Sequence, residues 1–282
     1  MAVQNSLTKS KARKNPLAVY LSSDAVKDQI NKVVGGKDGQ RFITAIISAV
    51  NTNHALQECS NASIVSAALL GESLKLSPSP QLGQYYMVPF NDKNKGKVAQ
   101  FQLGYKGYIQ LALRSGQYKK LNVLAIKEGE LIRYDPLDEE IEVKLIEDEV
   151  EREKAPTIGY YAMFEYLNGF RKTMYWSREK MESHAQKYSK GYAAKKGYTF
   201  WEKDFDAMAY KTMLRQLISK WGVMSIDMVT AMDSDLAVIN DDGTKDYVES
   251  EEYVIDAEPE VIQEAEPAPS AAAETPAGGI DW

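Results

Sequence analysis

Hydrophobic residues recur with two different periods along the middle of the chain, which predicts a mixture of helices and strands. One helix is expected where apolar residues are spaced by three or four positions, at Phe42, Ile46, Ile47 and Val50. A second helix is expected from about Ala62 to Leu76, because the segment Ser77-Pro78-Ser79-Pro80 cannot continue it.

The next part of the chain has the pattern of antiparallel strands. Residues 84–90 and 98–103 are typical of a hairpin with a cationic loop, and Gly104-Tyr105-Lys106-Gly107 then turns the chain into a short helix. Asn168-Gly169 is the dipeptide most typical of a two-residue hairpin turn. The other expected strands are 121–126, 131–134, 141–146, 157–167 and 170–176.

Helices are expected again after the last strand. Ser177 caps one of them, and Thr199 with Glu202 forms the capping box of a long helix that reaches Trp221. Strands thus lie between helices without the regular alternation of a parallel sheet, which predicts an α+β fold of hairpins and antiparallel sheet packed with helices in one core domain.

The two ends of the chain differ from this core. Residues 1–38 are weakly patterned and are expected to form an N-terminal arm, either disordered or used in oligomer contacts. The core is expected to span 39–232. Residues 233–282 are acidic and then rich in Pro, Ala and Glu, which predicts a disordered tail whose apolar tip, Ile280-Asp281-Trp282, is a candidate docking peptide.

The charge is distributed unevenly along the 282 residues. The whole chain has a formal net charge of −6, yet residues 233–282 hold 15 acids and one base, a net of −14. The remaining 232 residues have a net charge of +8, with an acidic insert at 128–153 between two basic segments. Only the body is therefore suited to a polyanion, and the tail is expected to compete weakly with it.

Several function classes lack their sequence signatures. No apolar run is long enough to span a bilayer, and the start of the chain lacks the apolar core of a secretory signal, so a cytoplasmic protein is expected. Cys59 is the single cysteine, His54 and His184 have no matched ligands nearby, and no phosphate-binding GxxxxGK[ST] loop is present. We expect no cofactor, no metal and no enzymatic activity.

One enzymatic alternative remains open. Metal-dependent nucleases place an acid on one strand and an (Asp/Glu)-x-Lys triplet on the next, to hold a cation and polarise water. Asp135 followed by Glu142 and Lys144 approaches this pattern, although the spacing is short and the segment is so acidic that such a triplet arises by chance.

Basic and aromatic residues are interleaved through the core, as in proteins that hold single-stranded nucleic acid with cations on the phosphates and rings against the bases. Fourteen of the 17 tyrosines lie between Tyr85 and Tyr210. Lys211 and Arg215 share one face of the long predicted helix, where an intervening phosphate would offset their repulsion. The other candidate DNA-binding residues from this pattern are Lys97, Tyr105, Lys106, Tyr108, Arg114, Lys119, Lys120, Lys190, Lys195 and Lys196.

The order of several motifs resembles the RecT family of phage and prophage single-strand annealing proteins. The similarity covers about residues 40–230 and leaves out the acidic tail. Its landmarks are Leu74-Lys75-Leu76-Ser77-Pro78, Tyr85-Tyr86-Met87-Val88-Pro89-Phe90, Gln102 through Ile109, Leu113 through Gln117, Trp201 through Met208, Lys211 through Arg215, and Ser219-Lys220-Trp221-Gly222.

The resemblance implies an ATP-independent recombinase that coats single-stranded DNA, pairs it with a complementary strand and holds the annealed duplex. It also implies self-association into rings or helical filaments, in the cytoplasm of a bacterial host, with a 5′→3′ exonuclease and a single-strand binding protein as partners. It places Lys106, Arg114, Lys211 and Arg215 in a DNA groove and adds Trp201 and Lys220 to the candidate residues. A scaffold that recruits a partner through its tail is a further alternative.

Overall fold

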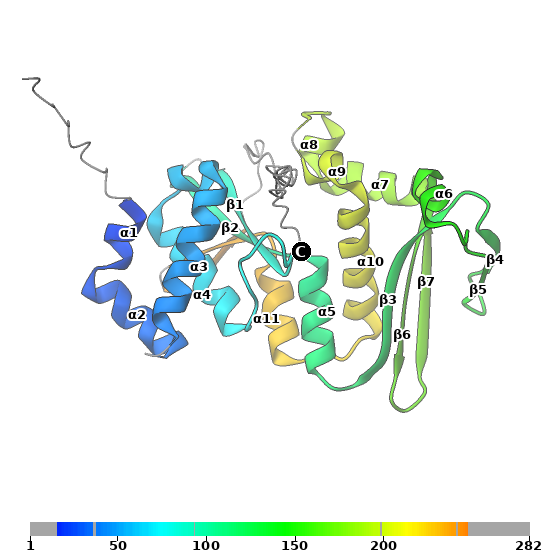
Figure 1. Ribbon diagram of the computed structural model, residues 1–282, viewed down its shortest axis with the longest axis horizontal. Coiled ribbons are helices and arrows are strands. Elements are labelled where there is room, and N and C mark those ends of the chain that lie inside the picture. The colour runs from blue at the N-terminus through cyan, green and yellow to red at the C-terminus, as the bar shows by residue number, and fades with distance from the viewer. Residues whose placement is uncertain (1–15, 36–37, 93, 198, 241, 248–282) are drawn as a thin grey trace, which may run out of the picture.

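Helices α1–α4 lie at one end of the molecule and strands β3–β7 at the other, with α5, α10 and α11 between them (Figure 1). The computed structural model describes residues 16–35, 38–92, 94–197, 199–240 and 242–247. Helices and antiparallel sheets pack in one body, which confirms the α+β prediction. No helix in these ranges is long and apolar enough to cross a membrane.

Residues 16–34 are more ordered than their sequence pattern indicates, while residues 1–15 of the predicted arm lie outside the described ranges. Within the predicted arm of residues 1–38, Leu17, Leu21, Val26 and Ile30 are buried, so two helices of this segment join the core. The available signal is a pair of i,i+4 apolar residues in each helix. The helices at this end are α1 (Pro16–Leu21), α2 (Asp24–Val34), α3 (Gly39–Thr52) and α4 (Asn61–Ser73), with a 3₁₀ turn at His54–Glu58.

A four-stranded sheet packs against these helices. Its hairpin pairs β1 (Tyr85–Asp92) with β2 (Gly96–Leu103), as predicted. The sheet continues through β8 (Ala237–Ile239) to β9 (Lys245–Tyr247), in the order β1-β2-β8-β9. One face of the hairpin is buried against α4, where the Tyr85 and Phe101 rings stack with centroids 5.1 Å apart.

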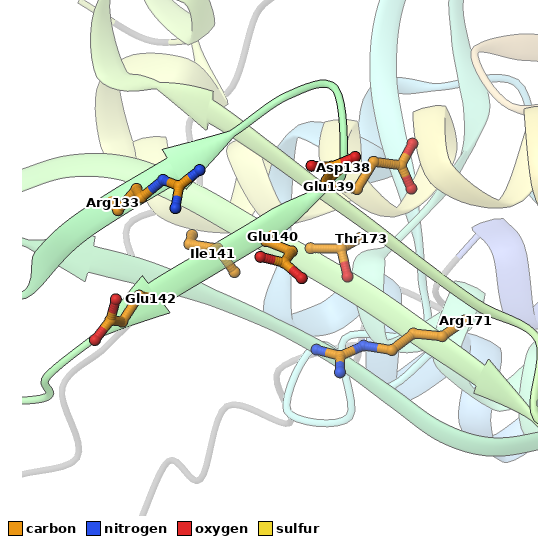
Figure 2. Close-up of a pocket in the computed structure, with 8 residues that line it drawn as sticks. All are labelled: Arg133, Asp138, Glu139, Glu140, Ile141, Glu142, Arg171 and Thr173. Carbon is orange, nitrogen blue, oxygen red and sulfur yellow. The ribbon is translucent and has the colours of Figure 1, made fainter.

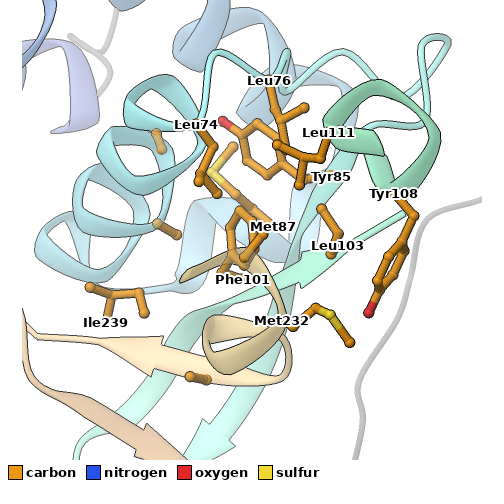
Figure 3. Close-up of a cluster of buried hydrophobic side chains, with 14 of the residues drawn as sticks. Leu74, Leu76, Tyr85, Met87, Phe101, Leu103, Tyr108, Leu111, Met232 and Ile239 are labelled. Carbon is orange, nitrogen blue, oxygen red and sulfur yellow. The ribbon is translucent and has the colours of Figure 1, made fainter. Parts of the chain in front are cut away.

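The chain beyond Met232 completes this core, which corrects the predicted start of a disordered tail at residue 233. Helix α11 (Ile226–Ser234) runs past that boundary, and all of β8 is buried. Ile239 lies in the same apolar cluster as Phe101 and Leu103 (Figure 3). The acidic average of residues 233–282 conceals a short apolar strand at its start.

Three helices join the two ends of the molecule. Helix α10 (Phe205–Trp221) packs on the second sheet with one side and on α5 (Tyr105–Arg114) with another. The capping box of Thr199 and Glu202 is present, but it begins the single-turn helix α9 (Phe200–Lys203). The long helix starts afresh after Asp204, whose carboxylate accepts the Ala207 N–H.

The second sheet has the order β3-β6-β7, and all its neighbouring strands are antiparallel. Its strands are β3 (Tyr118–Lys127), β6 (Thr157–Tyr166) and β7 (Arg171–Ser177). Asn168-Gly169 forms the predicted turn between β6 and β7, where Gly169 has φ +86°. The chain then enters α7 (Arg178–Tyr188), which Ser177 caps as predicted, and α8 (Lys190–Ala193).

The acidic insert forms an outer hairpin, β4 (Leu131–Asp135) with β5 (Glu140–Val143), followed by α6 (Glu149–Lys154). Glu130 holds it in place. Its fully buried carboxylate accepts the Lys127 and Ile146 N–H groups and pairs with Arg152, at 2.6 Å from Nε. Burial opposes ionisation of Glu130, but the bond from Arg152 and the two N–H groups outweigh it and lower its pKa.

Glu130→Gln is expected to lower the free energy of unfolding by about 2 kcal/mol at neutral pH, because bonds to a charged acceptor become bonds to a neutral one. A lowered folded-state pKa stabilises the fold above the ordinary Glu pKa and loses that effect as pH falls through the lowered value. Urea unfolding of both proteins over a pH series should show the gap closing in acid; a gap independent of pH would contradict this account.

Candidate nucleic-acid interface

One group of predicted residues gathers at the start of α5. Lys106 is exposed, and its Nζ lies 5.9 Å from the centroid of the half-buried Tyr105 ring. The N-cap, Gly104, supplies no side-chain acceptor to the first turn of the helix. A Cβ on Gly104 would lie 2.1 Å from the Gly83 carbonyl oxygen, so glycine allows this close approach. Free N–H groups and a lysine at a helix start suit a phosphate oxygen.

A second group lies between α8 and α9, and an aromatic contact joins it to the first. Lys190, Lys195 and Lys196 are exposed, and none forms an ion pair within the described ranges. The ring of Phe200, which follows this segment, lies 6.1 Å from the Tyr86 ring of β1. Tyr86 in turn lies beside the start of α5, since a Cβ on Gly104 would be 3.1 Å from its ring. We call the combined region the α5–α9 surface, defined by Tyr86, Tyr105, Lys106, Lys190, Lys195, Lys196 and Phe200.

The remaining exposed cations among the predicted residues lie at the opposite end of α5 and α10. Lys119 and Lys120 both face Glu165, at 2.5 and 3.7 Å, and this carboxylate has a lowered pKa chiefly through its bond with Lys119. Arg114 and Lys220 are exposed nearby. The local positive charge is thus partly neutralised within the protein, whereas the lysines of the α5–α9 surface lack such a carboxylate.

Lys211 and Arg215 point inward and share an acidic partner that the sequence analysis missed. Asp235, 4% exposed, accepts bonds of 2.9 Å from Lys211 Nζ and from Arg215 Nη1. It also accepts the Leu103 N–H at 2.9 Å. The anion predicted between the two cations is therefore present, but it is a carboxylate of the same chain. Arg215 remains partly accessible, with 41% of its side chain exposed.

Of three other predicted residues, two are buried and the third is held in an ion pair. Tyr108 is completely buried, which raises the pKa of its hydroxyl although that hydroxyl accepts a hydrogen bond from Arg215 Nη1. Trp201 is 7% exposed and packs edge-on against Phe205, 5.0 Å away. Lys97 pairs with Glu58. The two rings are core residues rather than stacking surfaces: Tyr108 lies in the main apolar cluster, and Trp201 packs among rings of α7, α8 and α10.

Phe200 was not among the residues predicted from the sequence. The sequence pattern places Tyr86 in a strand but does not indicate which face of the sheet its side chain lies on. Phe200 follows the Lys- and Tyr-rich segment at 187–198 directly, and counting all aromatics instead of tyrosines would have included it. No sequence signal identifies Asp235, because its role depends on α10, which is distant along the chain.

The nuclease alternative gains no support from the geometry. The Asp135 carboxylate accepts the Leu137 N–H and pairs with Arg133 at 2.8 Å; these contacts lower its pKa. In the register of the β4–β5 hairpin, Asp135 lies opposite Glu140, and Arg133 lies opposite Glu142. Within the described ranges no group of three His, Cys, Asp or Glu side chains is arranged to hold a metal ion.

Comparison with known proteins identifies the family. The RecT family model matches residues 40–255, three quarters of the chain. The chain belongs to the RecT family. The matched range includes β8, β9 and Asp235, so the family region extends past the boundary expected at Met232.

Two relatives support this assignment. Protein RecT of Escherichia coli (strain K12) is 30% identical, over 81% of this chain and 86% of the relative. The uncharacterized protein YqaK of Bacillus subtilis (strain 168) is 41% identical, over 87% of this chain and 81% of the relative. Membership of the RecT family supports a recombination protein of the annealing type.

Proposed function

We propose that this protein anneals complementary single strands of DNA without ATP, by coating one strand and holding the duplex that forms. The observation that supports it most directly is the α5–α9 surface, where exposed lysines without ion pairs lie beside the rings of Tyr86, Tyr105 and Phe200. Such a surface binds phosphates through counterion release and contacts bases without reading their sequence. Sequence-independent binding is what annealing needs, because the two strands select each other by base pairing.

Within this proposal the phosphates follow the lysines from α5 to α8, and the start of α5 contributes backbone N–H groups. Arg215 contributes from the inner edge through the part of its side chain that is exposed. Coating a long strand requires many subunits in contact, so self-association belongs to the proposal, as does a 5′→3′ exonuclease that exposes the strand. A single-strand binding protein would be the competitor for that strand.

The test is a mixing experiment. Two complementary oligonucleotides, each carrying one dye of a fluorescent pair, should form duplex faster with the protein than without it, in the absence of ATP. A parallel sample with magnesium and labelled single and double strands should leave the DNA intact. Failure to accelerate pairing even at low salt would overturn the annealing proposal, and shortened DNA would favour the nuclease alternative instead.

A further inference from the structure

A pocket of about 430 Å³ lies at the end of the molecule opposite α1, between the outer hairpin and the edge strand β7 (Figures 1 and 2). One wall is β5, where Glu140 and Glu142 are separated by one residue, Ile141. The other wall is β7, which supplies Arg171 and Thr173. Among the described strands, β5 and β7 each pair on one side only.

The pocket has an excess of unpaired negative charge. Asp138, Glu140 and Glu142 line it, and their carboxylates have neither an ion pair nor a hydrogen bond within the described ranges. Glu139 is already paired with Lys172, and Arg133 with Asp135. Arg171 is the opposing cation, so the lining favours a positively charged occupant.

A second observation indicates that this occupant is a polar chain rather than solvent cations alone. Thr173 is 6% exposed and lines the pocket beside Glu140, yet its hydroxyl has no hydrogen-bond partner in the described part of the protein. The hydroxyl oxygen itself is not sealed in the core, so a polar occupant of the pocket can reach it. The outer edges of β5 and β7 also offer backbone N–H and C=O groups, and extended peptides bind such edges by adding a strand.

The chain itself contains a matching segment. Residues 9–14, Lys-Ser-Lys-Ala-Arg-Lys, hold four cations, and no acid precedes Asp24. In an extended chain Lys9, Lys11 and Arg13 would share one face, because alternate residues of a strand do. Glu140 and Glu142 have the same two-residue repeat on β5. The cations and carboxylates would therefore repeat at the same interval along two adjacent strands.

The position of this segment indicates a contact between copies. The described chain starts at Pro16, at the end of the molecule opposite β4 and β5 (Figure 1). We propose that residues 9–14 of one copy bind as an extended strand in the acidic pocket between β5 and β7 of a second copy. This contact joins subunits head to tail, which produces a ring or an open filament according to the rotation between them. It rests on the self-association in the proposed function and is independent of DNA binding.

A charge swap tests the contact. Lys9→Glu/Lys11→Glu and Glu140→Lys/Glu142→Lys each place like charges on both sides, so each variant alone should sediment mainly as monomer, while the wild type forms larger species. A mixture of the two variants restores opposite charges at every contact and should restore the larger species. The matched control is Glu147→Lys/Glu153→Lys, which makes the same charge change at exposed positions of the insert outside the pocket and should sediment like the wild type.

Three outcomes would overturn the contact: a monomeric wild type, single variants that still associate, or a mixture that stays monomeric. A mixture that stays monomeric would also result if residues 9–14 bound the pocket of their own chain. All measurements are made without DNA, by analytical ultracentrifugation of the full chain. If the charge-swap variants behave as expected but the wild type does not anneal DNA, the result would therefore count against the proposed function alone.

Discussion

Asp235→Ala should lower the free energy of unfolding by about 3 kcal/mol, because it leaves Lys211 buried without a counter-charge. The Lys211 side chain is 12% exposed, so water cannot replace the missing carboxylate. The change also removes the acceptor of the Leu103 N–H, at the end of the inner strand β2. Loss of the Arg215 ion pair should contribute less to the fall in the free energy of unfolding, since 41% of the Arg215 side chain is already in contact with solvent.

Urea unfolding followed by circular dichroism measures this effect. Asp227→Ala is the control, because Asp227 is an exposed acid in the first turn of the same helix, α11, and should cost under about 1 kcal/mol. Asp235→Asn should fall between the two, since its amide oxygen still accepts the Leu103 N–H. If Asp235→Ala were as mild as the control, Asp235 would not be the counter-charge that holds α10 to the sheet.

The second large effect concerns DNA. Replacing Lys106, Lys195 and Lys196 together by alanine removes three exposed cations of the α5–α9 surface. Removing one lysine–phosphate pair lowers the slope of log affinity against log salt by about 0.7 for single strands, so affinity near 0.1 M salt should fall about 100-fold for the three together. Fluorescence anisotropy with a labelled oligonucleotide at several salt concentrations measures both quantities.

The matched control makes the same charge change on the other surface. In Arg114→Ala/Lys119→Ala/Lys120→Ala, two of the removed lysines face Glu165, so few counterions should be involved and affinity should stay near the wild-type value. The reverse result, a steep loss in the control and none in the α5–α9 variant, would move the DNA to the far end of α5 and α10.

Much of the fold is predictable because local patterns decide it. The β1–β2 hairpin, the Asn168-Gly169 turn and the apolar face of α10 follow from side-chain periodicity and turn chemistry. Helices α1 and α2 escape prediction because each is short and has only two buried apolar positions. The break at Asp204 escapes it because a cap at Thr199 does not show how long its helix continues.

The candidate site is only partly predictable, for a different physical reason. Local sequence shows that a lysine or tyrosine is present but not whether the fold supplies its partner. Tyr108 and Trp201 are buried in the core, while Lys106 and Lys195 are exposed without an ion pair. By local composition Asp235 looks like part of the acidic tail. Its structural role becomes visible only in the fold, because the two cations that it pairs with lie on α10. Segment averages of charge cannot separate a carboxylate that belongs to the fold from those that follow it.

The late position of Asp235 has a consequence for the protein as it is synthesised. Asp235 follows Lys211 by 24 residues and Arg215 by 20. At roughly 5–20 residues added per second, the ribosome produces α10 about one to five seconds before its carboxylate. During that interval the nascent helix carries two adjacent cations that nearby polyanions, including RNA, are free to contact. The interval lasts at least until Asp235 has been synthesised, since the contact needs Asp235 beside both α10 and β2.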